Sequence, residues 1–241
     1  MSPLPRSFMR LPLISHPSDL FKILEKGNRK VPSTPWLVSP LLGGPLQNGV
    51  CSLRCFATYD GIYTAERRLD NLEHITRNIR VLLNRKRRRN VAIEGELFWP
   101  REKQHDPLGA HTRFHLVDVV SSSSSNASSF TAEKRFDFLW DFMYGEKRFH
   151  HCFLSVAMEV RSVEDWSHML ATIDGKESSK RKSHRPKYEL LRVCRADSVY
   201  VEEEEEQQQQ QQHDAHEEVG FCYSLRQQSS GPIQLLYQDQ R

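Results

Sequence analysis

The side chains best suited to a chemical role form a run of consecutive cations near the middle of the chain: Arg85, Lys86, Arg87, Arg88 and Arg89. Neighbouring like charges repel each other, and an anionic partner relieves that repulsion. Phosphate contacts from such a run give affinity without reading a base sequence. The run also matches a nuclear-import signal, and cations are favourable at a helix end in any case. The sequence leaves these three interpretations open.

A second basic cluster follows later in the chain and comprises Lys180, Arg181, Lys182 and Arg185. If the fold brings the two clusters together, they line one groove. Stacking surfaces for bases are available from the aromatic residues Tyr59, Tyr63, Phe98 and Trp99. The two clusters therefore predict binding to a nucleic-acid backbone, and the sequence does not distinguish RNA from DNA.

Metal-binding and catalytic motifs are weak. His150, His151 and Cys152 are zinc-ligand types, as are His213 and His216. However, adjacent residues on a strand point to opposite faces, and the second pair adjoins a Glu/Gln tract. The sequence contains no serine-nucleophile elbow, glycine-rich phosphate loop or HExxH motif. We therefore expect no metal site, no cofactor and no catalytic residue.

Two further groups of polar residues are interpreted as ordinary sheet positions. Glu94 and Glu96 alternate with Ile93 and Leu97, which is typical of the solvent side of a half-buried strand. An active site built on this carboxylate pair is the less favoured alternative. The later basic residues and thiol, Arg192, Cys194 and Arg195, lie in a β-rich run and receive the same interpretation.

The periodicity predicts an α+β chain. A helix starting at Thr64 carries an apolar stripe, and a short helix spans residues 18–26. Residues 91–99 and 112–120 form an antiparallel pair of strands joined by a long loop. Further helices are expected at 131–144 and 162–173, and Ser162 followed by Asp165 resembles a capping box at the start of the second. Strands are expected at 148–160, 188–201, 219–225 and 233–237. The fold class is a single domain with a mostly antiparallel sheet packed by two or three helices.

Low-complexity segments divide this domain. Residues 1–57 form a proline-rich, basic leader, and residues 58–201 form the core domain. The core is interrupted by a Ser-rich loop at 121–129 and a basic loop at 176–187. A Glu/Gln insertion at 202–218 precedes returning strands at 219–241.

Charge and cysteine content restrict the cellular setting. Residues 1–55 carry seven Lys and Arg against two acids, whereas residues 202–241 carry two against nine. An acid-poor, Arg-bearing start is typical of mitochondrial presequences, and a plain N-terminal arm is the alternative. Five irregularly spaced cysteines indicate reduced thiols inside the cell. No apolar stretch is long enough to span a membrane.

These observations favour a non-catalytic component of a ribonucleoprotein or RNA-processing assembly in the mitochondrial matrix. Its expected partners are nucleic acid, with RNA preferred, and the protein subunits of that assembly; no small-molecule substrate is indicated. The alternative is a nuclear adaptor or regulatory subunit whose basic run is an import signal. An enzyme with an unrecognised site is the third hypothesis.

Overall fold

The computed structural model describes most of the predicted core and part of each flanking region. The described residues are 11, 13–30, 34–41, 50–64, 66–85, 91–100, 109–121, 130–144, 151–154, 157–173, 188, 190–199 and 220–225. Within them the fold is α+β, as predicted. The structure has two mixed β-sheets where the sequence analysis expected one mostly antiparallel sheet.

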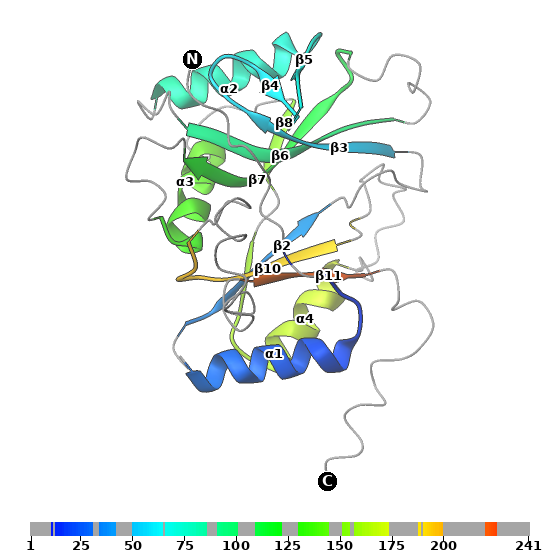
Figure 1. The fold of residues 1–241 in the computed structure, drawn as a ribbon, viewed down its shortest axis with the longest axis vertical. Helices are drawn as coiled ribbons and strands as arrows, with labels where there is room; N and C mark the ends of the chain where they lie inside the picture. The colour runs from blue at the N-terminus through cyan, green and yellow to red at the C-terminus, as the bar shows by residue number, and fades with distance from the viewer. Residues whose placement is uncertain are drawn as a thin grey trace.

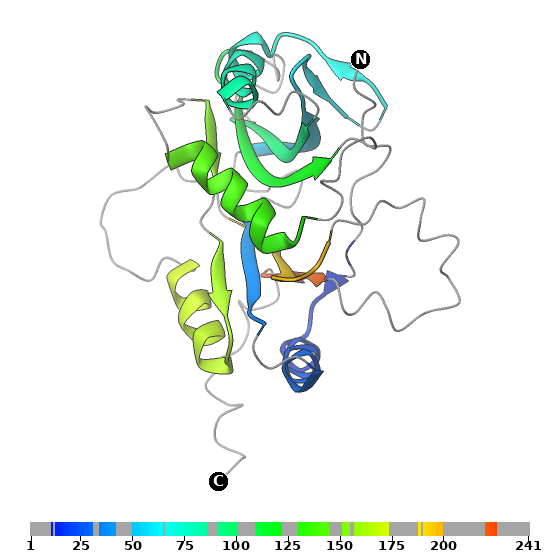
Figure 2. The same cartoon turned by 90° about the vertical axis from the view of Figure 1, so that its left-hand side faces the viewer.

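The two sheets lie one above the other, with helices on their outer sides (Figure 1). The helices in the described residues are α1 (Pro17–Lys30), α2 (Glu73–Arg85), α3 (Ala132–Tyr144) and α4 (Val163–Ile173). Helix α2 covers the upper sheet, and α1 and α4 lie against the lower sheet (Figure 1). Helix α3 runs beside both sheets on one side of the molecule (Figure 2).

The lower sheet, here called sheet A, has the strand order β1-β11-β10-β2-β9. Its strands are β1 (Leu13–Ile14), β2 (Trp36–Leu41), β9 (Met158–Val160), β10 (Leu190–Arg195) and β11 (Gly220–Ser224). Only the β1–β11 pair is parallel. Sheet A thus combines strands from both ends of the chain.

The upper sheet, here called sheet B, has the order β5-β4-β3-β6-β7-β8. Its strands are β3 (Val50–Ala57), β4 (Ile62–Tyr63), β5 (Arg68–Leu69), β6 (Val91–Pro100), β7 (Arg113–Ser121) and β8 (Cys152–Leu154). The predicted β6–β7 pair is antiparallel, and β8 adds to β7 in parallel. A β-bulge interrupts the β6–β7 register between Glu94 and Gly95.

Gly95 is required at this bulge because the neighbouring backbone is very close. A Cβ atom at this position would lie 2.4 Å from the His115 carbonyl oxygen and 2.4 Å from the Phe114 ring. Atoms at that separation overlap, so any larger residue would force β6 away from β7. The glycine therefore holds the two central strands of sheet B in close register.

Each sheet packs its own apolar core on its outer side. The stripe predicted on α2 is confirmed, and its buried residues pack on sheet B with Ile93 and Leu97 of β6. A second core joins α1 and α4 to sheet A and is centred on Trp36, Trp166 and Tyr223. Two small clusters of buried apolar residues lie elsewhere among the described residues. The main hydrophobic driving force therefore acts outside the space between the sheets.

Helix starts agree with the sequence in one case and differ in another. Before α4, Ser162 Oγ accepts a hydrogen bond from the Asp165 N–H (3.1 Å) and Asp165 Oδ2 accepts from the Ser162 N–H (3.0 Å), which confirms the predicted capping box. The predicted cap of α2 at Thr64 is wrong. Thr64 Oγ1 instead accepts from the Arg67 N–H (3.1 Å) in the β4–β5 turn, and α2 begins at Glu73.

The N-terminal segment contributes to both cores. Residues 13–14, 17–30, 36–41 and 50–57 supply β1, α1, β2 and β3, so removal of residues 1–57 would take a helix and three strands from the described fold. Import of this segment into mitochondria stays a prediction. The expected strand at 148–160 is divided, because β8 joins sheet B and β9 joins sheet A. No helix in the described part of the chain is both long and apolar enough to cross a membrane.

Candidate functional site in the inter-sheet layer

The face of sheet B that looks toward sheet A carries a row of charged side chains beside a small apolar cluster of Phe56, Ala92 and Val120. Side chains alternate along β6, so Ile93 and Leu97 face α2 whereas Glu94 and Glu96 face the other sheet. The register places Glu94 opposite Asp118 and Glu96 opposite both Arg54 and His115. This arrangement corrects the interpretation of Glu94 and Glu96 as solvent-facing, because their exposed fractions are 1% and 7%.

Sheet A contributes a cation to the same space. On β10, Leu191 and Val193 belong to the core under sheet A, so Arg192 projects to the opposite side, toward sheet B. Arg192 is buried, and it is more than the ordinary sheet residue that the sequence analysis expected. We call the charged and titratable residues between the sheets the inter-sheet polar layer: Arg54, Glu94, Glu96, His115, Asp118, Arg135 and Arg192.

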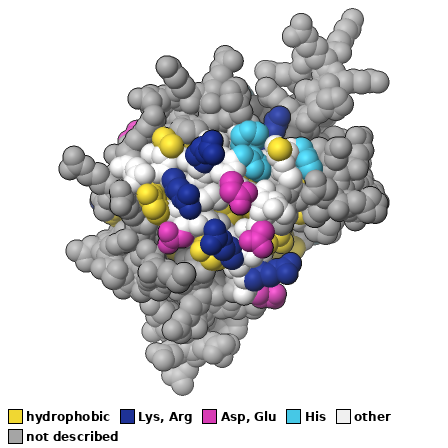
Figure 3. Space-filling view, turned by 90° about the horizontal axis from the view of Figure 1, so that it is seen from above, with side chains coloured by type: hydrophobic (Ala, Val, Ile, Leu, Met, Phe, Trp, Pro, Cys, Tyr) yellow, Lys and Arg dark blue, Asp and Glu magenta, His cyan; other side chains and the backbone are white. Residues whose placement is uncertain are grey.

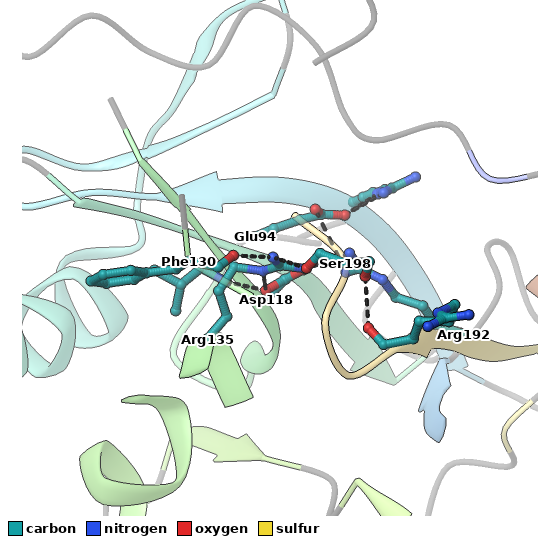
Figure 4. A network of polar contacts seen from close by, with 9 residues as sticks. Glu94, Asp118, Phe130, Arg135, Arg192 and Ser198 are labelled. Atoms are coloured by element: carbon teal, nitrogen blue, oxygen red, sulfur yellow. Dashed lines mark hydrogen bonds and ion pairs between the residues drawn. The ribbon is translucent and has the colours of Figure 1, made fainter. Parts of the chain in front are cut away.

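Asp118 is the centre of this layer (Figure 4). Arg192 donates a hydrogen bond from sheet A to Asp118 Oδ2, and Arg135 Nε donates to Oδ1 at 2.8 Å. The Val119 N–H also donates to Oδ1, at 2.7 Å. Burial alone would raise the pKa of Asp118, but the two guanidinium groups outweigh burial and hold the pKa below its ordinary value. Asp118 is therefore a carboxylate at neutral pH.

Arg135 ties α3 to both sheets. Besides Asp118, its guanidinium donates to the Phe130 carbonyl oxygen at 2.7 Å and the Ser198 carbonyl oxygen at 3.1 Å. Ser198 follows β10, and its carbonyl oxygen also accepts from the Ala132 N–H at the start of α3. One buried side chain thus connects the end of β10, the start of α3 and strand β7. We infer that this end of the layer fixes the two sheets relative to each other.

The Asp118 end of the layer is closed to any large ligand. The cavity there has a volume of about 30 Å³ and is lined by Ser39, Asp118, Arg135 and Arg192 together with apolar neighbours. That volume is roughly enough for one water molecule. The described residues therefore leave no room for a nucleotide beside Asp118.

The other end holds a histidine between a carboxylate and an aromatic ring. His115 Nδ1 lies 3.2 Å from Glu96 Oε2, and the imidazole stacks on Phe153 with ring centroids 4.6 Å apart and an interplanar angle of 9°. Phe98 contacts the same Phe153 ring edge-on at 5.0 Å. Tyr188 lies 6.2 Å from His115. A carboxylate that orients an imidazole is the usual arrangement for a general acid or base.

Arg54 gives this end its access to solvent. Its Nε donates to Glu94 Oε1 at 2.7 Å, and a second nitrogen of the guanidinium contacts the same oxygen. The Arg54 side chain is 44% exposed, whereas Glu94 is enclosed. Phe98, Phe153 and Tyr188 are half-buried. The open end therefore presents the Arg54 cation and the half-buried aromatic rings, whereas His115 is itself buried against Phe153, with an exposed fraction of 1%.

The nucleic-acid-binding residues predicted from the sequence lie almost entirely outside the described residues. Arg85 is the last residue of α2, and nothing further is described of its side chain. The others are outside the described part: Lys86, Arg87, Arg88, Arg89, Lys180, Arg181, Lys182 and Arg185. Their role, and their predicted meeting in one groove, therefore stay predictions. Among the described residues, no group of three His, Cys, Asp or Glu is placed to hold a metal ion.

The residues of the inter-sheet polar layer were not predicted from the sequence. Glu94, Glu96 and Arg192 were noted, but each was assigned to an ordinary sheet surface. A signal was present, because Asp118 interrupts an otherwise apolar stretch of β7 and His115 lies in the same strand. Buried carboxylates and histidines within an apolar strand indicate either a partner charge or a functional site.

Structural comparison finds solved structures with a similar arrangement of elements. A solved structure titled "Pmar-Lig_Pre." matches with a TM-score of 0.50 and 11% identity, covering 79% of this chain and 43% of that chain. The ATP-dependent DNA ligase from bacteriophage T7, in complex with ATP, has a TM-score of 0.47 and 12% identity, over 79% of this chain and 64% of the ligase. The chain thus spans less than two thirds of either structure. No protein-family model and no curated protein matches the sequence.

This comparison corrects the function predicted from the sequence. A non-catalytic component that binds an RNA backbone is not kept as the leading hypothesis, because the fold is shared with the solved structure titled "Pmar-Lig_Pre.". The nuclear adaptor, which is also non-catalytic, is set aside for the same reason, and a nuclear location stays untested. The sequence contained no motif for this fold, and the relation is visible only in the arrangement of the two sheets.

Proposed function

We propose that this protein is a nucleotide-dependent enzyme of the ligase class that acts on nucleic acid, with its active site at the open end of the inter-sheet polar layer. The proposal draws on the fold shared with a ligase structure and on the chemistry of this layer. An enzyme of this class joins a hydroxyl group to a phosphate and uses a nucleoside triphosphate as the energy source.

The observation that carries the proposal is the burial of charge between the sheets. Two packed sheets normally fill the space between them with apolar side chains. Here only two small apolar clusters lie on the inner faces, and three carboxylates and three guanidinium groups share the space, five of the six being buried. Burying charge is costly, and replacing a buried ion pair with apolar residues is often stabilising. Charge retained in such a place indicates a functional site.

Three groups at the open end have distinct roles in this proposal. The exposed part of the Arg54 guanidinium binds a phosphate oxygen of the nucleotide or the nucleic acid. The half-buried rings of Phe153 and Tyr188 offer surfaces for a base. His115, oriented by Glu96, accepts the proton of the attacking hydroxyl group as the oxygen–phosphorus bond forms and the bond to the leaving group breaks.

A joining assay tests the proposal directly. The full chain is incubated with Mg²⁺, ATP or GTP and an end-labelled nicked duplex of DNA, RNA or a hybrid, and joined product is resolved on a denaturing gel. We expect nucleotide-dependent joining, and the three duplexes identify the preferred nucleic acid. His115→Gln and Glu96→Gln should lower kcat by about 10²–10⁴-fold. Arg54→Gln should mainly raise KM.

The control is Arg161→Gln, because Arg161 is exposed, pairs with the nearby Glu159 at 3.1 Å and lies outside the inter-sheet polar layer. This variant should keep the wild-type rate. If the folded wild-type protein neither binds a nucleoside triphosphate nor joins any of the three duplexes, the proposal is wrong. It is equally wrong if joining occurs but the His115, Glu96 and Arg54 variants behave as the control does.

A further inference from the structure

A second charged site lies on the outer face of the molecule, away from the inter-sheet polar layer. It is a hollow of about 190 Å³ between the β4–β5 hairpin and α2. The charged residues that line it are Arg68, Asp70, Glu73, Arg77 and Arg80. Figure 3 views this side of the molecule from above and shows Arg or Lys side chains among Asp or Glu side chains. The hollow has room for several water molecules at about 30 Å³ each.

Arg80 is held in place at the edge of this hollow. Its Nε donates to the Tyr59 carbonyl oxygen at 2.7 Å, and another of its nitrogens lies 3.4 Å from the Asp60 carbonyl oxygen. The guanidinium also lies over the Tyr59 ring, 5.8 Å from its centroid. These contacts fix the cation before any ligand arrives, which lowers the entropic cost of binding.

Arg68 is placed by the glycine next to it. A Cβ atom on Gly61 would lie 3.0 Å from Arg68 Nε, so the absence of a side chain lets the guanidinium lie against the turn. The backbone of this turn is also held by Thr58, whose N–H donates to the Gly61 carbonyl oxygen at 2.8 Å. Two of the three cations therefore rest on one well-ordered turn.

The charges in the hollow do not neutralise one another directly. In the described part of the chain, neither Arg68 nor Arg77 forms an ion pair, although Asp70 and Glu73 line the same hollow. Three guanidinium groups face two carboxylates, which leaves a net positive charge. Guanidinium groups bind phosphate oxygens with paired, charge-assisted hydrogen bonds. The geometry thus suits an oxyanion that bridges the cations.

We propose that this hollow binds a phosphate group. The group comes either from a small phosphate such as pyrophosphate or from the backbone of a nucleic acid, because both present the same oxygens. This inference does not depend on the proposed enzyme activity, since none of its residues belongs to the inter-sheet polar layer.

Binding measurements on matched variants test the site. Pyrophosphate is titrated into the full chain by calorimetry, and a labelled single-stranded oligonucleotide is followed by fluorescence anisotropy at several salt concentrations. Arg68→Gln and Arg77→Gln should each weaken binding about tenfold. For the oligonucleotide, each should also reduce the salt slope by about one. Arg67→Gln is the control, because Arg67 is exposed and adjacent in sequence but does not line the hollow.

The outcomes separate the two sources. Loss of pyrophosphate binding alone identifies a small phosphate as the ligand, and loss of oligonucleotide binding alone identifies the backbone. Loss of both shows that the hollow accepts either. The inference is overturned if neither probe binds, or if Arg68→Gln and Arg77→Gln match Arg67→Gln for both probes. Circular dichroism confirms that each variant is folded, and a failed joining assay leaves this result unaffected.

Discussion

The two sheets have opposite chemistry on their two sides. On the outer sides, α2 and the pair α1 and α4 enclose cores of mostly buried aliphatic and aromatic residues. On the inner sides, the sheets meet through three carboxylates, three guanidinium groups and a histidine beside two small apolar clusters. The outer cores are stabilised by burial of apolar surface, which has no preferred direction. The inter-sheet polar layer is stable only when each buried charge has a partner of opposite charge. We infer that stability resides mainly outside the sheets and function between them.

The largest test of this contrast is Asp118→Asn. The change leaves Arg192 and Arg135 buried with one negative charge fewer, so we expect a loss of about 3–5 kcal/mol in the free energy of unfolding. Denaturant unfolding at neutral pH measures it. The control is Asp197→Asn, which affects the partly exposed pair with Arg195 at 2.8 Å and should cost less than about 1 kcal/mol. If both variants lowered the free energy of unfolding equally, the buried ion pairs of Asp118 would contribute no more to stability than the partly exposed Asp197–Arg195 pair.

Shortening a side chain in the outer core should lower the stability of the protein without lowering its activity per folded molecule. Ile79 is fully buried between α2 and sheet B, so Ile79→Ala should lower the free energy of unfolding by about 2–5 kcal/mol. Val81 lies on the same helix and is 38% exposed, and Val81→Ala should change the stability by no more than about 0.5 kcal/mol. Joining activity per folded molecule should be unchanged in both. A selective loss of activity in Ile79→Ala would contradict the assignment of function to the inter-sheet layer.

The pH dependence of unfolding should report on the inner layer when the wild type is compared with Asp118→Asn. The other carboxyl groups with a lowered pKa, Asp165 and Asp197, are present in both proteins and cancel in that difference. The pKa of Asp118 is lower in the folded than in the unfolded chain, so its contribution is fully present above the ordinary Asp pKa of about 3.9. That contribution is lost as the pH falls through the lowered folded value. We therefore expect the wild-type protein to lose its advantage over Asp118→Asn below about pH 4. A stability difference that stays constant from pH 7 to pH 3 would contradict this explanation.

The smallest expected difference concerns two thiols. Burial raises the pKa of Cys152, in the outer core, to about 12 and that of Cys222, on the inner side of sheet A, to about 11. Cys222 is also only half-buried. Iodoacetamide labelling at pH 8, followed by peptide mapping, should therefore modify Cys222 faster than Cys152, with both slow relative to the unfolded chain. Faster labelling of Cys152 would show that the outer core opens before the inner layer.

Local patterns predicted many of the elements. The apolar stripe of α2, the alternation of β6 and the capping box at Ser162 each report on neighbours a few residues away, and all three are confirmed. Thr64 shows the limit of such signals. A threonine hydroxyl group accepts a backbone hydrogen bond in a turn as readily as at a helix start, so its presence alone does not distinguish the two.

Sequence alone determined which residues of each strand share a face, because side chains alternate along an extended backbone. It placed Glu94 and Glu96 together, opposite Ile93 and Leu97. Only the tertiary structure decided that the acidic face lies against a second sheet. That contact forms because β10 packs opposite β7, so that Arg192 reaches Asp118, which lies 74 positions earlier in the chain. Whether a strand face is buried depends on the element that packs against it, and no local pattern in β6 specifies that element. The polar face expected to meet water is thus the candidate site.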